Sequence, residues 1–367
     1  MSEDIIKKKT NYVVYVVIGL VVLAGTLVYF TYPDIVTSQE PTINILTYGS
    51  FFDSGANPNQ TLKYLIDNFE NWHHVKIKIS YASTDLFGQI VETKGTGYDI
   101  VIGLNNLDSY LAAKSGYFYH FNVSNASYVN KTLYSFIQSS GYVIPYEYSP
   151  LTTDYNLSGP INTSIIQNLS FSDFYNSTIA NQYILENPGT LNINGEDFLL
   201  GQIAFYTGIL HENWTTFWES SKGIQITSDW SSGFTLFENG QRQMFFSYAT
   251  DPAYNAYFNE SPIGTTPFHY GGKSYAWMQV LGVGILNSSK YHNIDEEFVN
   301  WLLGNKVQNL IPLNEWMYPA NENIILPHVY SVNPPVSSII PLNFYLNMSV
   351  AANNISTWSL EWSSIEG

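Results

Sequence analysis

Residues 42–48 read Thr-Ile-Asn-Ile-Leu-Thr-Tyr, a short apolar run that predicts a buried β-strand. Apolar residues then recur at helical spacing over 62–72, alternate over 75–79, and return to helical spacing over about 86–93. The continuous apolar run Tyr98-Asp-Ile-Val-Ile-Gly103 predicts a further strand. Strands that alternate with helices are typical of an α/β fold with a mainly parallel sheet.

The alternation resumes later in the chain, after an extended stretch over 141–148 that predicts a crossing strand. Further elements are predicted at 182–185, 198–210, 223–227, 231–239 and 244–248, then a helix from Pro252, a strand over 276–286, and helices over 295–303 and 349–362. A chain of 367 residues is too long for one small core and long enough for two lobes.

The composition restricts the class of ligand. The net charge is −16, and only 12% of the residues are charged. Without residues 1–41, which hold three Lys and four acids, 11 basic and 26 acidic residues remain, a net charge of −15. Such a field repels nucleic-acid phosphates and attracts cations, so the sequence argues against nucleic-acid binding. The absence of cysteine excludes disulfides, thiolate metal sites and a cysteine-linked lipid anchor.

The N-terminal region predicts a membrane anchor. Residues 12–32 contain no charge and are long enough to span the hydrocarbon core of a bilayer. Lys7–Lys9 precede this segment, so the positive-inside rule places residues 1–11 in the cytoplasm. The alternative is a cleaved signal peptide, but the apolar run is long and Phe30-Thr-Tyr-Pro-Asp34 is a poor cleavage site. Residues 33–41 then form a tether, and the rest of this single-pass cell-membrane protein is expected to be extracellular.

Potential N-glycosylation sites support an exported surface. About half of them are expected by chance at this content of Asn, Ser and Thr, and the excess indicates a glycoprotein. The Asn-x-Ser/Thr sites are Asn59, Asn122, Asn125, Asn130, Asn156, Asn162, Asn168, Asn176, Asn213, Asn259, Asn287, Asn347 and Asn354.

No motif indicates catalysis, so the sequence predicts a protein that is not an enzyme and carries no cofactor. Phe268-His-Tyr-Gly-Gly-Lys-Ser274 ends like a phosphate-binding loop, but Pro267 stands where the first glycine is required. No Gly-x-Gly-x-x-Gly, His-Glu-x-x-His or Gly-x-Ser-x-Gly sequence occurs. The neighbouring His73 and His74 lie at a predicted helix end, which favours solvation over metal binding.

Aromatic and acidic residues gather in three segments. They read Ile226-Thr-Ser-Asp-Trp230, Phe245-Phe-Ser-Tyr-Ala-Thr-Asp-Pro-Ala-Tyr254 and Asn314-Glu-Trp-Met-Tyr-Pro319. The faces of aromatic rings attract positive charge, and carboxylates add Coulomb attraction, so these segments indicate a site for an organic cation. The alternative is that the rings are ordinary core residues.

Together with Tyr48, Asp99–Asn106 and Pro145-Tyr-Glu-Tyr148, these segments resemble, in order, the thiamine-binding solute receptors of ABC importers. Those receptors belong to the type II periplasmic binding proteins, and the similarity spans nearly all of the chain beyond the predicted anchor. It implies two α/β lobes around a cleft. It also implies thiamine or a thiamine phosphate as the ligand, with an ABC permease and an ATPase as partners.

The resemblance also implies lobe boundaries and ligand contacts. One lobe would hold 42–145 and 258–310, and the other 146–257 and 311–367. The family clasps its ligand with aromatic, hydroxyl and acidic side chains from both lobes. The corresponding candidates are Tyr48, Asp85, Glu147, Trp230, Tyr248, Thr250, Asp251, Tyr254 and Trp316.

Departures from the family pattern affect the expected ligand. Asp251 stands where the family has serine, and an ionised carboxylate there would repel a phosphate, so we expect a preference for free thiamine over its phosphates at neutral pH. The loop Asn187-Pro-Gly-Thr190 lacks the family's Arg and Ser, which leaves Asn187 and Thr190 as its candidate contacts.

Helix starts beside these segments bear on the ligand's tail. Asp251 before Pro252 resembles an N-cap, and Ser228 or Asp229 would cap the helix after Trp230. The backbone N–H groups of these two helix starts are expected to hold an anionic or hydroxyl tail of the ligand.

Other interpretations remain open. The same fold could bind a polyamine, which would need carboxylates at both ends of the cleft, or ferric iron, against which the lack of adjacent tyrosines counts. A glycosylated surface or adhesion protein built on a receptor fold is a different class. The low charged fraction suits an acidic exterior, as in an archaeon from an acidic habitat.

Overall fold

The computed structural model describes residues 40–82, 85–189 and 193–366. The chain divides into two units, Met1–Pro41 and Thr42–Gly367, and the architecture below is that of the second unit. The expected cytoplasmic tail, the membrane anchor and all but the last residues of the tether lie outside the described residues. Within the described residues, no helix combines the length and the apolar character that crossing a bilayer requires.

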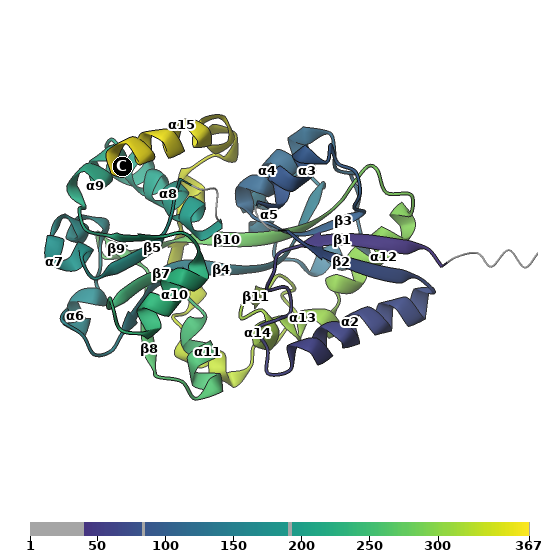
Figure 1. Ribbon diagram of the computed structural model, residues 1–367, viewed down its shortest axis with the longest axis horizontal. Helices are drawn as coiled ribbons and strands as arrows, with labels where there is room; N and C mark the ends of the chain where they lie inside the picture. The colour runs from purple at the N-terminus through teal and green to yellow at the C-terminus, as the bar shows by residue number, and fades with distance from the viewer. Residues whose placement is uncertain (1–39, 83–84, 190–192, 367) are drawn as a thin grey trace, which may run out of the picture. The chain divides into compact units, whose positions relative to one another are not determined.

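The second unit is built on one mixed sheet with the strand order β2-β1-β3-β10-β4-β7-β5-β6 (Figure 1). The strands are β1 (Thr42–Thr47), β2 (Lys76–Tyr81), β3 (Ile100–Leu104), β4 (Val143–Asn156), β5 (Tyr183–Glu186), β6 (Gln225–Thr227), β7 (Met244–Tyr248), β8 (Ile263–Thr266), β9 (Phe268–Tyr270), β10 (Lys273–Ile285), β11 (Tyr318–Pro319) and β12 (Ile339–Pro341). β1 lies parallel to β2 and β3, and β5 lies parallel to β6 and β7, so the predicted parallel arrangement is confirmed in each half of the sheet.

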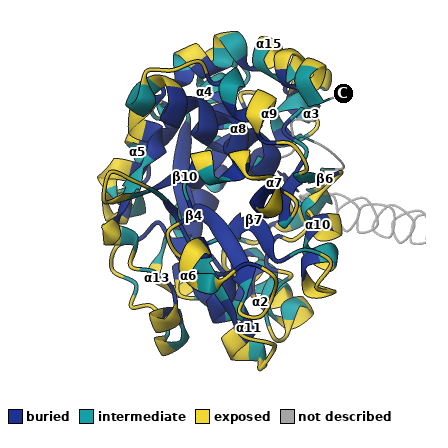
Figure 2. Cartoon of the chain, turned by 90° about the vertical axis from the view of Figure 1, so that its left-hand side faces the viewer, coloured by how far each residue is buried: buried dark blue, intermediate teal, exposed yellow. Residues whose placement is uncertain are grey.

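Two long strands join the halves. β10 pairs with β3 at one end and with β4 along most of its length. β4 in turn pairs with β7, and all of these pairs are antiparallel. Figure 2 shows β10, β4 and β7 as a buried band through the centre of the chain. The predicted crossing over 141–148 is therefore confirmed as the first part of β4, and the predicted strand over 276–286 as most of β10.

Helices cover both faces of the sheet, with α4 opposite α2 in one half and α8 opposite α10 in the other (Figure 1). The α-helices are α2 (Pro58–His73), α3 (Leu86–Glu92), α4 (Asn106–Ser115), α5 (Lys131–Ile137), α6 (Thr163–Ile166), α7 (Ser177–Ala180), α8 (Ile193–Phe205), α9 (Thr215–Ser220), α10 (Trp230–Glu238), α11 (Asp251–Phe258), α12 (His292–Leu302), α13 (Asn305–Gln308), α14 (Ile311–Asn314) and α15 (Met348–Glu366). A π-turn at Tyr206–Leu210 extends α8, and short 3-10 turns lie at Ser124–Tyr128, Phe171–Tyr175, His328–Val332, Val336–Ser338 and Leu342–Tyr345.

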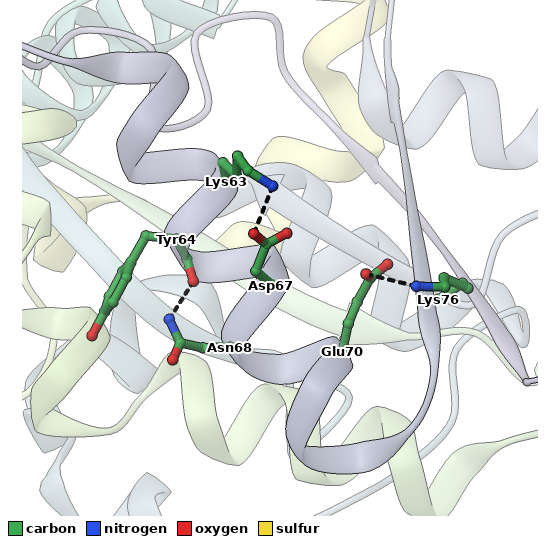
Figure 3. Close-up of polar contacts among 6 residues, drawn as sticks. All are labelled: Lys63, Tyr64, Asp67, Asn68, Glu70 and Lys76. Carbon is green, nitrogen blue, oxygen red and sulfur yellow. Dashed lines mark hydrogen bonds and ion pairs between the residues drawn. The ribbon is translucent and has the colours of Figure 1, made fainter.

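The local sequence of α2 explains its position. Pro58 occupies the first turn, where a missing backbone N–H costs nothing, and Leu65 and Phe69, four residues apart, are buried against the sheet. The exposed face carries Lys63 and Asp67, whose Nζ and Oδ2 atoms lie 2.6 Å apart (Figure 3). Such an exposed pair contributes little to stability because solvent screens it, so the apolar face determines where α2 packs.

Two hydrophobic cores define the two lobes. β1, β3 and α12 pack in the first core, while β5, α8 and α9 pack in the second. The division differs from the boundaries that the sequence predicts. Trp277 belongs to the second core and Met278 to the first, so β10 changes lobe between neighbouring residues. Phe268, on β9, packs with the second core, and Ile311, on α14, packs with the first.

The potential glycosylation sites lie on the surface. Every one of the thirteen asparagines is exposed or half-buried. The side chains of Asn130, Asn162 and Asn176 each accept a backbone hydrogen bond at the start of a helix.

Candidate ligand-binding site

A cavity of about 570 Å³ lies between the two lobes. Its walls come from residues that follow β1, β3, β5 and β7, from the crossing strands β4 and β10, and from the segment around Trp316. In α/β sheets the crevice beyond the carboxyl ends of parallel strands is where ligands bind, and the volume suits a small organic molecule.

Seven side chains of the wall carry a carboxyl group. They are Asp85, Asp108, Glu147, Glu186, Glu196, Asp251 and Glu315. No Lys, Arg or His is among the described residues that line the cavity. Acidic groups without any basic partner favour a cation and disfavour an anion in the cavity.

Aromatic rings form part of the same wall. Trp230 begins α10, stacks on Phe234 with ring centroids 4.7 Å apart, and donates a hydrogen bond from Nε1 to the Ser247 hydroxyl at 3.0 Å. Trp316 meets Tyr254 edge to face, with centroids 5.2 Å apart. These contacts hold the indole rings in fixed orientations, so an incoming ligand loses little entropy in ordering them.

The indole of Trp316 is also fixed from the first lobe. Its Nε1 donates to the backbone oxygen of Ser54 at 2.8 Å. The residue itself has φ +55°, the left-handed region that tryptophan rarely adopts, so its backbone is strained. Strained backbone of this kind is found at ligand sites, where the surrounding structure holds it in place.

Two glutamates and two tyrosines form a buried cluster beside Trp316. The Tyr48 hydroxyl lies 2.6 Å from that of Tyr146, 3.1 Å from Glu147 Oε1 and 3.0 Å from Glu315 Oε2. Glu315 also accepts the backbone N–H of Phe52. Burial raises the pKa of Glu147 to about 8, because the solvation that its charged form loses outweighs the hydrogen bonds from the two tyrosines.

The cluster has spare capacity to accept a hydrogen bond. Glu147 is only 1% exposed, and its Oε2 has no hydrogen-bond partner. The side chain of Gln279, on β10, is fully buried and its Oε1 is likewise without a partner. Both residues line the cavity, so the central strands offer two unused acceptors to a ligand that carries N–H groups.

A second acidic group spans the lobes. Asp85 caps α3 by accepting the backbone N–H of Phe87 at 2.9 Å, and Asp108 lies in the first turn of α4. Asn105 Nδ2 reaches across to Glu196 Oε1, on α8, at 3.1 Å. Burial and then the charges of Asp85 and Glu196 raise the pKa of Asp108 well above its usual value. Repulsion of this kind is relieved when a cation enters.

The sequence predicts Asp251 as a helix cap, and the structure shows that it is not one. Thr250 is the N-cap residue, and Asp251 is the first residue of α11. Its carboxylate instead accepts the hydroxyl of Ser247 and, at 3.3 Å, the backbone N–H of Tyr248. Burial and then the charge of Asp251 raise the pKa of the neighbouring Asp154 well above its usual value. The predicted cap before Trp230 is confirmed, since Asp229 accepts the N–H of Ser232 at 2.8 Å.

The structure brings most of the sequence-predicted residues to this cavity. Those on its wall are Tyr48, Asp85, Glu147, Trp230, Tyr248, Asp251, Tyr254 and Trp316. Thr250 is fully buried behind the wall, with no hydrogen-bond partner for its hydroxyl. Asn187 is not on the wall and accepts the N–H of Gly189, while Thr190 lies outside the described residues.

Four acidic wall residues and one glutamine of the wall were not among the ligand contacts predicted from the sequence. They are Asp108, Glu186, Glu196, Gln279 and Glu315. Glu315 directly precedes Trp316, so its place in an acidic and aromatic segment was a usable signal. The others lie on a strand or in the first turn of a helix, where polar residues are common. Their place at the cavity depends on how the two lobes pack.

Two α/β lobes, crossed by two shared strands and enclosing an acidic and aromatic cleft, define the class of solute-binding receptors. The family model for "Bacterial extracellular solute-binding protein" matches residues 54–309, more than half of the chain, and the chain belongs to this family. The expected two-lobed fold and the role of substrate binding for an ABC transport system are thus confirmed.

Relatives of the chain are similar along most of its length. The thiamine-binding periplasmic protein of Salmonella typhimurium is 23% identical over 334 residues, which cover 88% of this chain and 93% of the relative. That of Escherichia coli is 24% identical over 334 residues, with the same coverage of 88% and 93%. A solved periplasmic thiamin binding protein superposes with a TM-score of 0.73 at 22% identity, covering 89% of this chain and 97% of that one. At this identity the superposition supports the fold alone.

Proposed function

We propose that this protein binds thiamine, or a closely related organic cation, in its cleft and delivers it to an ABC permease that is driven by an ATPase. The observation that carries the proposal is the cavity wall, which combines seven carboxyl groups with the rings of Tyr48, Trp230, Tyr254 and Trp316. The similarity to thiamine-binding periplasmic proteins over 88% of the chain favours thiamine among organic cations.

The chemistry of thiamine suits these side chains. Its thiazolium ring is a permanent cation, and a cation over an aromatic face gains roughly 0.5–2 kcal/mol, more when water is excluded. Its aminopyrimidine ring offers N–H groups to acceptors such as Glu147 Oε2 and Gln279 Oε1, which have no other partner. A buried acceptor that gains its missing hydrogen bond contributes roughly 1–3 kcal/mol.

Calorimetry on the full-length protein tests the proposal. We expect thiamine to bind tightly, and Trp230→Ala to weaken binding at least tenfold, or about 1.4 kcal/mol. Trp72→Ala is the matched control, because Trp72 is 74% exposed on α2 and does not line the cavity. Absence of thiamine binding to the wild type, or equal loss in both variants, would refute this function.

A polyamine is the second candidate, on one specific observation. Five of the seven cavity acids fall into two groups, Glu147 with Glu315 and Asp85 with Asp108 and Glu196, and no member of one group is among the charges that shift the pKa of Glu315 or Asp108 in the other. Two separate negative regions suit a ligand with two positive ends. Competition between spermidine and bound thiamine decides between them, since a true polyamine receptor would bind spermidine more tightly.

Nothing observed favours ferric iron. The described part of the chain contains no group of three or more His, Cys, Asp or Glu side chains placed to hold a metal ion. We include ferric ion in the same calorimetric series and expect no heat of specific binding.

The proposal extends to the location of the protein. Residues 12–32 would anchor it in the cell membrane with residues 1–11 in the cytoplasm and the cleft outside, as the run of uncharged residues after Lys7–Lys9 favours. Surface asparagines of the Asn-x-Ser/Thr sites would carry glycans, and an archaeal source would fit both features. Alkaline extraction of membranes and mass spectrometry of glycopeptides test these points; release of the intact chain by alkali would overturn the anchor.

A further inference from the structure

Two helices of the second lobe begin beside the cavity, next to the end of β5. α8 starts at Ile193 and α10 at Trp230, on opposite faces of the sheet, and Glu186 is the last residue of β5 (Figure 1). The Glu186 carboxylate accepts the backbone N–H groups of Asn194 and Gly195, in the first turn of α8, and of Trp230 in α10. One side chain therefore holds the starts of both helices.

Helix starts of this kind ordinarily bind anions. The first backbone N–H groups of a helix lack internal partners, and the helix dipole adds partial positive charge at the same end. A phosphate or carboxylate of a ligand is therefore stabilised there. In this protein the Glu186 carboxylate already occupies this position. Its side chain lines the cavity and is only 6% exposed.

The first turn of α8 packs closely against the end of β5. A methyl carbon added at Gly195 would lie 2.4 Å from the backbone oxygen of Asn187 and 2.8 Å from that of Glu186. This close approach brings the N–H groups at the start of α8 next to Glu186.

The start of α11 at the cavity is also occupied by the protein itself, but in another way. Asp251 begins α11, is 8% exposed, and accepts hydrogen bonds from Ser247 and from the backbone of Tyr248, which precede the helix. The first N–H groups of α11, those of Ala253 and Tyr254, donate to the backbone oxygen of Thr250, so they already have a partner in the chain.

We infer that Glu186 determines specificity: its carboxylate takes the place of a ligand's anionic tail, and the receptor selects organic cations that carry no phosphate or carboxylate. This inference rests on the proposed function for the choice of organic ligand. It adds a residue on β5 that acts together with Asp251 on α11, and it limits the ligand class to unesterified cations.

The charge of Glu186 sets the conditions of the test. Burial and then the charge of Asp229 raise its pKa to about 7, while the three backbone N–H groups lower it. The charged or titratable groups near it are Asp229 before α10, Asp197 on α8 and Tyr248 on β7. Binding is therefore measured near pH 8, where the Glu186 carboxylate is mostly ionised.

The first experiment uses inorganic phosphate, so it does not depend on the identity of the organic ligand. Thermal unfolding of the full-length chain is followed with phosphate and with chloride at matched ionic strength. We expect phosphate to leave the wild type unchanged and to raise the melting temperature of Glu186→Ala by at least about 2 °C, because three N–H groups become free. Glu219→Ala, an exposed acid on α9, is the control and should behave like the wild type.

The second experiment compares thiamine with thiamine monophosphate by calorimetry. We expect the wild type to bind thiamine at least tenfold more tightly, and the nearly isosteric Glu186→Gln to reduce that preference at least about fivefold. The preference of the wild type should also fall as the pH drops below about 7, as Glu186 becomes protonated. Glu219→Gln should change neither.

The outcomes separate the two proposals. A wild type that binds neither ligand refutes thiamine binding, while the phosphate experiment still tests Glu186. An unchanged ligand preference in Glu186→Gln overturns the inference even if thiamine binds well, and so does equal binding of phosphate by the wild type and Glu186→Ala. Glu186→Gln serves as the folded substitute if the alanine variant does not fold.

Discussion

Replacing Glu147 by glutamine should stabilise the protein as the pH rises and weaken its hold on a cation. Glu147 lies on β4, accepts hydrogen bonds from Tyr48 and from Tyr146 at 2.9 Å, and keeps one oxygen without a partner. Glutamine can accept the same two bonds through its amide oxygen. What the substitution removes is the ionisation of a buried group beside Glu315.

The magnitude follows from the pKa of Glu147. Burial raises it to about 8 in the folded protein, against 4.5 as the ordinary value. Below pH 4.5 the Glu147 carboxyl is protonated in both the folded and the unfolded chain, and its contribution to stability is complete. As the pH rises through 8 this contribution is lost, because the carboxyl of the unfolded chain ionises first and ionisation favours the unfolded state. At about 1.36 kcal/mol per pKa unit, the wild type loses about 3 kcal/mol by pH 7 and about 5 kcal/mol well above pH 8.

Urea unfolding over a pH series measures the effect. The free energy of unfolding of Glu147→Gln minus that of the wild type should increase by about 3 kcal/mol between about pH 4 and pH 7. The amide nitrogen that replaces the free oxygen adds a cost that does not depend on pH, so the slope is the diagnostic quantity. Glu361→Gln, on an exposed position of α15, should give a flat difference.

Two results would contradict this reasoning. A flat difference for Glu147→Gln would mean that the carboxyl is ionised in the folded protein without cost. Unchanged affinity for the cation above pH 8, where Glu147 is ionised, would mean that its charge does not act on the ligand; we expect a loss of about tenfold at that pH.

Three further outcomes follow from the same contacts. Tyr48→Phe removes the hydroxyl shared by Glu147 and Glu315, and should lower the free energy of unfolding by about 1–3 kcal/mol at neutral pH in urea titrations. A larger loss on repeating the titration above pH 8, where the Glu147 carboxyl ionises, would agree with the carboxylates being the affected partners. Gly195→Ala forces a carbon to within 2.4 Å of a backbone oxygen and should cost about 1–3 kcal/mol, visible as a lower melting temperature; an unchanged value would show that the loop yields freely. Trp230→Phe keeps an aromatic face but loses the indole N–H donor, so calorimetry should find a smaller loss of affinity than for Trp230→Ala; equal losses would mean that the ring face is not used.

Much of the fold could be predicted because its signals are local. The apolar run over 42–48 became β1, and the alternating run over 75–79 became most of β2. The pairing of β10 with both β3 and β4 could not be predicted from the sequence, since no local pattern indicates which distant strand completes a sheet.

The site was predictable where family resemblance and chemistry coincide. Tyr48, Trp230 and Trp316 were found because large rings beside acids form a recognisable pattern. Glu186 and Glu196 were not, because an acid at the end of a strand or in the first turn of a helix satisfies ordinary capping preferences. Their role depends on how closely two helix starts approach one cavity, which only the folded chain determines.

The position of β10 also has a consequence for synthesis. Ile285 pairs with Ile100, so β3 and one edge of β4 have no partner until β10 is translated, nearly two hundred residues after β3. At roughly 5–20 residues per second, those edges stay open for roughly 10–40 s on the ribosome. Open strand edges attract other chains, so substitutions that delay the pairing of β10 are expected to reduce yield before they reduce the stability of the finished molecule.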